Sequence, residues 1–286
     1  MRTIEQALIE AKQQLTLTNY TDDSRLEAEI ILAYVLGQKK EFLLTHPETT
    51  LSQKALSNYV RLVKQRTCGV PVAYLIHNRE FYGLDYYVDR HVLIPRPETE
   101  LMIDVAKKRC EKIRYNSLKI CDIGTGSGCI AITLLKEIPD IYYMDALDVS
   151  RSALKIARYN AINLLSESQY KKIHFINTNI FLWNPSPRKY DLIVSNPPYI
   201  TSSEYKHLDP QVSKYEPKLA LHASDNGQEF YKRIATILPG ALNKDGICLL
   251  EINSSMVNTT QALFSKWSVQ IHKDFSGRPR ILEIKR

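Results

Sequence analysis

The chain contains no apolar run that approaches the ~20 residues a membrane-spanning helix requires. Its first six residues lead into an amphipathic pattern and not into the long apolar core of a secretory signal, so we expect a cytoplasmic protein. Internal repeats and low-complexity segments are also absent. These absences favour an ordinary globular protein that works away from membranes.

Cysteine is scarce and widely spaced. The five cysteines form no Cys-x-x-Cys pair, which argues against both a zinc site and a disulfide framework. We therefore expect reduced thiols, mostly in the core, and no bound metal. The cysteines are Cys68, Cys110, Cys121, Cys129 and Cys248.

Positive charge is in excess, because 38 Lys and Arg residues against 31 Asp and Glu give a net charge of +7. Such an excess favours an acidic partner, such as nucleic acid or a nucleic-acid-bound complex. The basic residues are spread along the chain, however, and a solvated surface is the simpler explanation of short clusters such as 107–109. At 286 residues, the chain is long enough for one large or two modest domains.

The first 75 residues show helical periodicity. Apolar residues recur with the spacing of a helix face from Ile4 to Leu15. A second such stretch follows a capping box at Ser24 and Glu27 and ends at Gly37, and a third covers 51–66. Residues 1–75 are therefore predicted to form a small helical domain, for which recognition of a substrate is the natural role.

The pattern then changes. Residues 80–94 are aromatic and β-branched around a break at 83–85, which favours a β-hairpin, and 76–95 are predicted to link two domains. Over 96–286, strands alternate with helices, which is the signature of a parallel sheet, and the last two strands are expected to pair antiparallel. The candidate strands are 118–123, 142–149, 173–177, 191–195, 247–252, 269–275 and 281–284.

Glycine is sparse, with 10 residues in 286, yet three fall in the run Asp122-Ile-Gly-Thr-Gly-Ser-Gly128 at the end of the first of these strands. Glycines at a strand-to-helix turn let a ligand approach the backbone closely. A dinucleotide fingerprint would need glycine at position 129, which is cysteine. The run therefore fits S-adenosyl-L-methionine better than NAD. The expected cofactor contacts are Gly124, Thr125, Gly126, Ser127 and Gly128.

A carboxylate lies at the end of the next strand. Asp148 stands 24 residues after Gly124, close to the spacing expected of a side chain that binds ribose hydroxyls. The alternative is that Asp148 caps the helix that starts near Arg151. Ser150 would serve as that cap equally well, so we favour the ribose role.

The segment Ser195-Asn-Pro-Pro-Tyr199 follows the fourth strand, on the sheet edge where open α/β sheets bind ligands. The Asn196 side-chain oxygen and the Pro197 carbonyl can accept both hydrogens of a planar NH2 group and hold its nitrogen in line with an electrophilic methyl. Pro197 and Pro198 stiffen the loop. Alone, the motif is compatible with an ordinary rigid turn. Its convergence with the two cofactor signals indicates methyl transfer to an NH2 group.

Four segments together carry a family resemblance. They are Leu93-Ile-Pro-Arg-Pro-Glu-Thr-Glu100, the glycine run, Asn196-Pro-Pro-Tyr-Ile200 and Tyr215-Glu-Pro217. With them, the chain resembles the protein-(glutamine-N5) methyltransferases that modify class I peptide-chain release factors, over nearly its whole length. The resemblance implies a Rossmann-like, seven-stranded class I methyltransferase domain over 96–286. Of the four segments, Leu93–Glu100 is the most specific to this family. The Asn-Pro-Pro-Tyr motif discriminates less well, because adenine-N6 methyltransferases share it.

The resemblance implies methylation of the side-chain amide of the glutamine in a release factor's Gly-Gly-Gln motif. By likeness, the glycine run holds the methionine part of the cofactor, Asp148 holds the ribose, and Asn196 also contacts the cofactor. Asn196 and Pro197 then accept the two amide hydrogens, while Pro198 and Tyr199 form and shape the glutamine pocket.

The resemblance leaves two points open. Asn179 and Ile180 stand where the family has an acidic residue and tryptophan, so Ile180 is expected to contact the cofactor without aromatic stacking and to lower its affinity somewhat; residues 253–256 depart from the family pattern as well. Arg96 and Glu98 lie either near the mouth of the active site or in a salt-bridge network that links the domains.

Two other functions compete with this interpretation. An adenine-N6 methyltransferase acting on RNA or DNA would use the same NH2 geometry, with Tyr199 as a stacking surface. The N-terminal helices show no dense run of Arg and Lys, however, so we expect no stable nucleic-acid binding. A catalytically idle binding module is disfavoured by the intact glycine run, Asp148 and the Asn-Pro-Pro-Tyr segment. We expect a monomer that takes class I release factors as its protein substrate.

Overall fold

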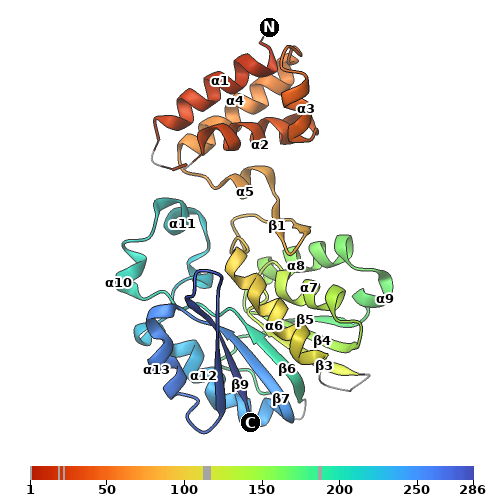
Figure 1. Cartoon of the computed structure of the whole chain (residues 1–286), viewed down its shortest axis with the longest axis vertical. Helices are drawn as coiled ribbons and strands as arrows, with labels where there is room; N and C mark the ends of the chain where they lie inside the picture. The colour runs from red at the N-terminus through yellow and green to blue at the C-terminus, as the bar shows by residue number, and fades with distance from the viewer. Residues whose placement is uncertain (1, 19, 22, 112–116, 186–188) are drawn as a thin grey trace. The chain divides into compact units, whose positions relative to one another are not determined.

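The structure is a computed structural model that describes all residues except 1, 19, 22, 112–116 and 186–188 (Figure 1). The chain forms two compact units. One contains residues 1–78 and 209–215, and the other contains residues 79–208 and 216–286. The domain limits expected from the sequence, 1–75, 76–95 and 96–286, stay a prediction.

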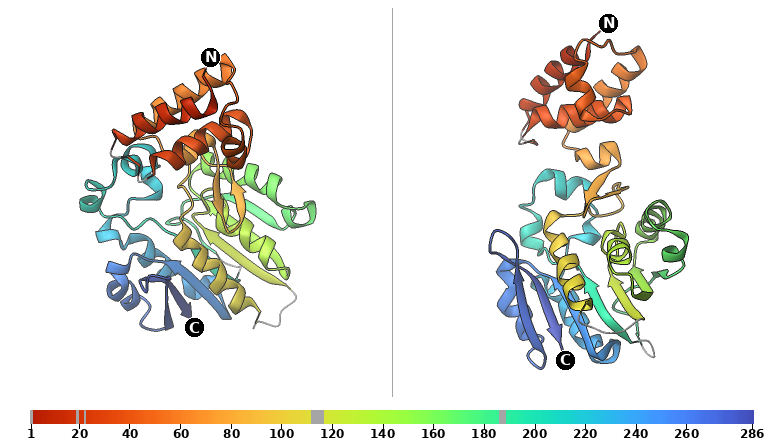
Figure 2. Two further views of the ribbon diagram at one scale, coloured as in Figure 1. Left: turned by 45° about the horizontal axis from the view of Figure 1, so that its top comes forward. Right: turned by 45° about the vertical axis from the view of Figure 1, so that its right-hand side comes forward.

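In the first unit, helices α1 to α4 pack as a small bundle (Figures 1 and 2). The apolar stripe from Ile4 to Leu15 is buried, as its spacing predicts. The hydroxyl of Tyr215 donates to the Cys68 carbonyl at 2.8 Å, which ties the late helix α11 to the end of α4. The helices are α1 (Ile4–Thr16), α2 (Ser24–Leu36), α3 (Lys40–Thr45), α4 (Gln53–Thr67), α5 (Val72–Ile76) and α11 (Pro210–Tyr215).

The start of α2 differs from the predicted capping box. Asp23, one residue before Ser24, is the N-cap, and its side chain accepts a hydrogen bond from the Leu26 backbone N–H at 2.9 Å. Both residue types cap helices well, and a carboxylate also suits the positive end of the helix dipole. The helix ends where predicted, at Gly37, whose φ of 63° is readily adopted by glycine.

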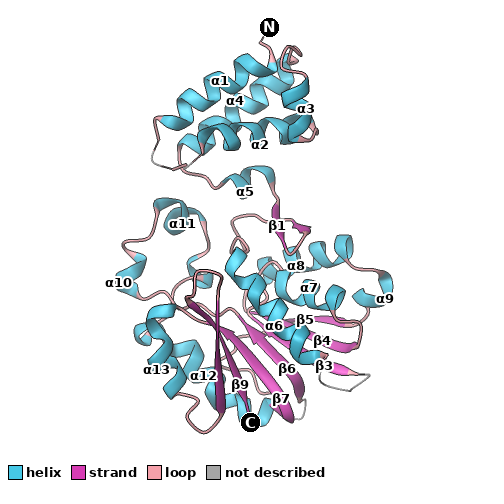
Figure 3. Cartoon of the chain, in the orientation of Figure 1, coloured by secondary structure: helices cyan, strands magenta, loops and turns pink. Residues whose placement is uncertain are grey.

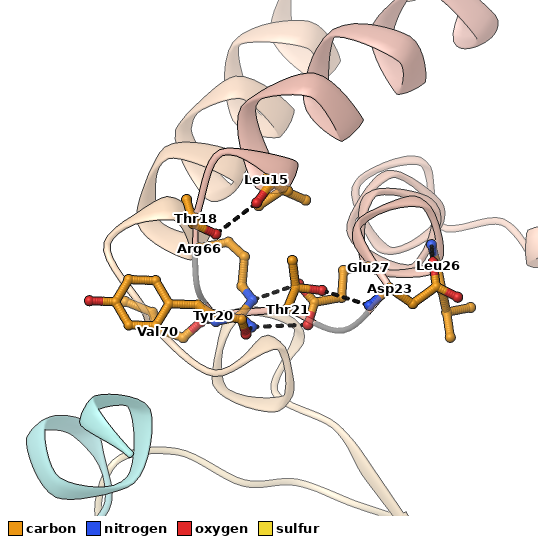
Figure 4. A network of polar contacts seen from close by, with 9 residues as sticks. All are labelled: Leu15, Thr18, Tyr20, Thr21, Asp23, Leu26, Glu27, Arg66 and Val70. Carbon is orange, nitrogen blue, oxygen red and sulfur yellow. Dashed lines mark hydrogen bonds and ion pairs between the residues drawn. The ribbon is translucent and has the colours of Figure 1, made fainter.

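Glu27 pairs instead with a buried arginine of α4 (Figure 4). Arg66 is only 2% exposed, and its Nε and Nη2 atoms donate to the two carboxylate oxygens of Glu27 at 2.7 and 3.0 Å. Other N–H groups of the guanidinium donate to the carbonyl oxygens of Tyr20 and Val70. These bonds offset the cost of burying the charge, and they join α2 to α4.

Removal of this carboxylate is expected to destabilise the first unit. Glu27→Ala leaves the Arg66 guanidinium buried without its counter-charge, which should lower the free energy of unfolding by about 2–4 kcal/mol. Glu29→Ala is the matched control, because it removes a more exposed pair with Arg25 and should cost at most about 1 kcal/mol. Urea denaturation followed by circular dichroism measures both. Equal losses in the two variants would contradict the structural role of the buried pair.

The second unit is built on a seven-stranded sheet (Figure 3). The strand order is β5-β4-β3-β6-β7-β9-β8, and β9 is antiparallel to both of its neighbours while the other pairs are parallel. This confirms the predicted Rossmann-like α/β fold. The strands are β3 (Leu118–Ile123), β4 (Ile141–Asp148), β5 (Ile173–Asn177), β6 (Tyr190–Ser195), β7 (Leu242–Glu251), β8 (Ser268–Lys273) and β9 (Pro279–Lys285).

Each face of the sheet has its own apolar core under covering helices (Figures 2 and 3). Side chains of α6, α7 and α8 fill one side, and those of α12 fill the other. In the part of the chain that the structure describes, no helix is long and apolar enough to span a membrane. The helices of this unit are α6 (Glu100–Cys110), α7 (Cys129–Glu137), α8 (Arg151–Leu164), α9 (Glu167–Tyr170), α10 (Ser202–Tyr205), α12 (Glu229–Ala241) and α13 (Val257–Ala262), with short 3-10 helices η1 (Pro97–Thr99), η2 (Lys218–Ala220), η3 (Asp225–Gly227) and η4 (Ser254–Met256).

The hairpin before the sheet is shorter than predicted. It consists of β1 (Arg79–Phe81) and β2 (Leu84–Tyr86), so the break falls at 82–83 and residues 87–94 form no strand. The N–H and C=O of Tyr87 bond to the side-chain amide of Asn160 on α8, at 2.9 and 3.0 Å. A side chain distant in sequence thus satisfies the backbone where a longer strand would have needed ladder hydrogen bonds.

The parallel strands all end at one edge of the sheet. β3 ends at Ile123, β4 at Asp148, β6 at Ser195 and β7 at Glu251. The segments that follow these strands therefore lie together, at the edge where open α/β sheets bind ligands.

Candidate active site

A cavity of about 540 Å³ opens at this edge of the sheet. Residues of the glycine run, Asp148 and residues of the Asn-Pro-Pro-Tyr segment line this cavity. The structure therefore brings these segments together, as the topology predicts. The role of each residue stays a prediction. The predicted site residues in the lining are Gly124, Gly126, Asp148, Ile180, Asn196, Pro197 and Pro198, whereas Thr125, Ser127, Gly128 and Tyr199 lie outside it.

The glycine run is folded back onto the end of β4. The N–H groups of Gly124 and Thr125 both donate to the Leu147 carbonyl at 2.8 Å. Gly124 and Gly126 have φ values of 79° and 56°, and a Cβ added at Gly124 would meet no atom within 4 Å. The backbone of the run therefore borders open cavity space, which is what close approach of a ligand requires.

The other residues of the run hold it from its buried side. The Thr125 hydroxyl donates to the Asp122 carboxylate at 2.7 Å, and burial raises the pKa of Asp122 to about 7. The Ser127 carbonyl accepts a hydrogen bond from the Asn160 side chain at 2.9 Å. A Cβ at Gly128 would lie 2.8 Å from a side chain of α7. These residues fix the shape of the turn.

Asp148 presents its carboxylate at the cavity wall. Its two oxygens accept hydrogen bonds from the backbone N–H groups of Gly126 at 2.9 Å and Ser150 at 2.8 Å. Ser150 caps α8, because its hydroxyl accepts from the Ala153 N–H, and it thereby takes the cap role that was the alternative for Asp148. Burial raises the pKa of Asp148, and the backbone hydrogen bonds oppose this. The carboxylate oxygens keep lone pairs that a ligand hydroxyl can use.

The Asn-Pro-Pro-Tyr segment is anchored where it leaves β6. The Ser195 hydroxyl donates to the Ile123 carbonyl at 2.7 Å, which fixes the end of β6 against the end of β3. The Asn196 Nδ2 atom donates to the Thr99 hydroxyl at 3.3 Å. Tyr199 packs against the core on the α12 side of the sheet, and burial raises its pKa to about 12. Tyr199 thus supports the loop from behind.

The main chain of this loop lies against a glycine. A Cβ added at Gly227 would lie 2.4 Å from the Tyr199 carbonyl oxygen, and Gly227 has a φ of 80°. Gly227→Ala is therefore expected to lower the free energy of unfolding by about 2–4 kcal/mol and to reduce turnover by displacing the loop. Gly277→Ala is the control, because its φ is 76° and an added Cβ meets no atom within 4 Å, so it isolates a backbone cost of about 1–2 kcal/mol. Thermal denaturation that gives equal losses would contradict the close approach.

An aromatic wall lines the cavity next to Ile180; Phe181 stands where the family also has phenylalanine, whereas no sequence motif signals Phe230. We use this name for Phe181 and Phe230, whose ring centroids lie 5.3 Å apart with the rings tilted by 55°. The Ile180 carbonyl accepts a hydrogen bond from Arg233 of α12 at 2.8 Å, which anchors the segment. Apolar aromatic surface is therefore present beside the position where the family's tryptophan is missing.

An ion pair joins two of the segments that carry the family resemblance. The side chain of Glu216 is buried, and it accepts hydrogen bonds from Arg96 at 2.6 Å and from the Ile94 backbone N–H at 3.2 Å. One sequence hypothesis placed Arg96 in a salt-bridge network that links the domains. Arg96 and Glu216 both belong to the second unit, so this ion pair lies within one unit. Because Pro217 and the residues after it line the cavity, the pair helps to position that wall.

Comparisons with known proteins match both units. The family description "PrmC N-terminal domain" matches residues 6–76, and "Methyltransferase small domain" matches residues 98–210. The chain is 34% identical to the release factor glutamine methyltransferase of Koribacter versatilis over 98% of this chain and 97% of that protein. The protein of the same name from Chlorobaculum tepidum is 37% identical over 91% of this chain and 89% of its own length.

Solved structures are similar at lower identity. The hMettl16 catalytic domain in complex with MAT2A 3'UTR hairpin 6 has a TM-score of 0.56 and 18% identity, and the match covers 89% of this chain and 92% of that one. A methyltransferase from Pyrococcus furiosus has a TM-score of 0.50 and 18% identity over 80% of this chain and 97% of that one. These likenesses show a methyltransferase fold and carry no argument about substrate.

Proposed function

Because the chain belongs to the family of release factor glutamine methyltransferases, we propose that it methylates the side-chain amide nitrogen, N5, of the glutamine in the Gly-Gly-Gln motif of class I release factors. S-adenosylmethionine would be the methyl donor. One observation carries the proposal: Asn196 and Pro197 line the same cavity as Gly124, Gly126 and Asp148. Two oxygens that can accept hydrogen bonds from an NH2 group thus line the same cavity as backbone and carboxylate groups that can bind a nucleoside.

The residues around the cavity fit S-adenosylmethionine. Its volume, about 540 Å³, falls in the usual range for small-molecule sites. Asp148 would bind the ribose hydroxyls, the backbone of Gly124 and Gly126 would admit the methionine part, and Ile180 and the aromatic wall would cover the adenine. When bound, the cofactor supplies a methyl group on a sulfonium, which is already a strong electrophile. The protein therefore contributes mainly position and electrostatics.

The glutamine nitrogen is the less reactive partner, because the lone pair of an amide is delocalised and the nitrogen is a poor nucleophile. The Asn196 Oδ1 and the Pro197 carbonyl accept the two N–H hydrogens, hold the nitrogen in line with the methyl and favour a more pyramidal geometry at nitrogen. The reaction is a direct displacement with no covalent enzyme intermediate. N-alkylation makes the remaining hydrogens acidic, so a proton leaves to water and no strong base is required.

Transfer of labelled methyl from S-adenosylmethionine tests the proposal. The acceptors are a purified class I release factor, the same factor with the Gly-Gly-Gln glutamine changed to alanine, total RNA and DNA. We expect label only on the intact release factor. Label on nucleic acid alone would move the assignment to an adenine-N6 methyltransferase.

A further inference from the structure

Three side chains from distant segments meet on the buried side of the Asn-Pro-Pro-Tyr loop. Thr99 ends η1, Asn196 follows β6, and Glu251 ends β7. The Thr99 Oγ1 atom lies 2.6 Å from Glu251 Oε2, and Asn196 Nδ2 lies 3.3 Å from Thr99 Oγ1. Thr99 is 2% exposed and Glu251 is 3% exposed, and neither lines the cavity. The pair therefore lies on the buried side of Asn196, which lines the cavity.

The direction of these hydrogen bonds follows from the chemistry of the groups. An ionised carboxylate only accepts, so the Thr99 hydroxyl hydrogen points to Glu251. The Thr99 oxygen is then left as an acceptor, and its partner on Asn196 has to be the amide N–H. The Asn196 side chain also favours the ionised form of the Glu251 carboxyl, which fits an amide N–H on that side. The nitrogen of the amide is thus held at the buried side, which leaves the oxygen for the cavity.

We propose that Thr99 and Glu251 are positioning residues that prevent a 180° flip of the Asn196 side-chain amide. The Asn196 Oδ1 atom, and not its NH2 group, then faces the N–H hydrogens of the substrate nitrogen that receives the methyl group. The inference rests on the proposed function, because it concerns an acceptor with two N–H hydrogens. The two orientations of an amide have almost the same shape, so packing alone does not choose between them. A turned amide would direct N–H groups at the N–H groups of the substrate and replace an attraction with a repulsion.

The ionisation of Glu251 links this arrangement to pH. Burial raises its pKa to about 7, while the Thr99 hydrogen bond, the Arg280 charge and the Asn196 hydrogen bond lower it and the Glu98 charge raises it. Because the pKa is raised, the carboxyl takes up a proton as the pH falls through about 7, and a protonated carboxyl can donate to Thr99 instead of accepting. Turnover is therefore expected to fall below this pH. The other titratable groups that interact with Glu251 are Tyr199, Tyr231 and Cys129, whose pKa values are all raised by burial.

Substitutions at Thr99 separate the hydroxyl from the packing. Thr99→Val removes the hydroxyl at nearly constant volume and is expected to lower kcat about 10–100-fold, with the Kd for S-adenosylmethionine changed by less than about twofold. Thr99→Ser keeps the hydroxyl and should retain kcat within about threefold. Thr260→Val is the matched control: Thr260 is equally buried, its hydroxyl bonds to Gln228 at 3.1 Å, and its loss should leave kcat unchanged. Wild-type kcat should fall between about pH 8 and 6, and this fall should be absent in Glu251→Gln.

Several outcomes would overturn the inference. An unchanged kcat in Thr99→Val would do so, and so would equal losses in Thr99→Val and Thr99→Ser, because the methyl group and not the hydroxyl would then matter. A loss of kcat in Thr260→Val as large as in Thr99→Val would show that replacing any buried threonine with valine lowers kcat. The wild-type protein is assayed first on the release factor, so that a failure of the proposed function is recognised separately. If an adenine amine is the acceptor instead, the same variants are compared on it, because adenine also offers two N–H hydrogens.

Discussion

Asn196→Ala is expected to lower turnover on the order of 10²–10³-fold while changing the affinity for S-adenosylmethionine by less than about threefold. The Asn196 Oδ1 atom would accept a hydrogen bond from the substrate nitrogen that receives the methyl group. This hydrogen bond matters most as that nitrogen approaches the methyl group. The side chain lies at the cavity wall and is held from behind by Thr99. Its loss should therefore remove alignment of the acceptor and leave the remainder of the cofactor site intact.

Steady-state methylation of a release factor and calorimetric titration of S-adenosylmethionine measure these two quantities. Asn163→Ala is the control, because Asn163 is an exposed residue of α8 whose side chain donates to the Tyr159 carbonyl of the same helix. It should behave as wild type in both assays. Equal losses of turnover and of cofactor affinity in Asn196→Ala would contradict the positioning role.

Asp148→Ala is expected to weaken S-adenosylmethionine binding about 10–100-fold, the range for loss of a charge-assisted hydrogen bond. The substitution removes the carboxylate at the cavity wall and also leaves the Gly126 and Ser150 N–H groups without their acceptor. The glycine run would then lose one of its attachments to β4. Both effects act on the cofactor end of the cavity, so at saturating cofactor the turnover should recover to within about tenfold of wild type.

The affinity is measured by isothermal titration calorimetry, with circular dichroism to check that the variant is folded. Asp140→Ala serves as the control, since Asp140 is exposed and lies outside the cavity lining. An unchanged Kd in Asp148→Ala would exclude the ribose role and leave Asp148 as a support for the glycine run alone.

Local patterns in the sequence account for much of the fold. The helix spacing from Ile4 to Leu15 and the end of α2 at Gly37 depend on residues a few positions apart, and the structure has both. The strand Leu118–Ile123 is marked by its own apolar run, although its hydrogen-bond partners are distant in the sequence. The N-cap of α2 was predicted one residue late because Asp23 and Ser24 are both good caps. Local chemistry did not choose between them.

Features that depend on contacts between residues far apart in the sequence could not be predicted from the sequence alone. Phe230 of the aromatic wall belongs to no motif, and only the packing of α12 beside the segment after β5 brings it to the cavity. The bond between Thr99 and Glu251 joins residues that are 152 positions apart. The short hairpin has the same origin, because the backbone just after it, at Tyr87, bonds to Asn160, 73 positions later in the chain.

Location of the transferred methyl group tests the central claim most directly. A class I release factor is incubated with the protein and S-adenosylmethionine, digested and analysed by tandem mass spectrometry, with Asn196→Ala in parallel. We predict one methyl group on the side-chain nitrogen of the Gly-Gly-Gln glutamine with the wild-type protein, and almost none with the variant. A methyl group on any other residue, or equal methylation by both proteins, would contradict a site in which Asn196 and Pro197 hold the glutamine amide.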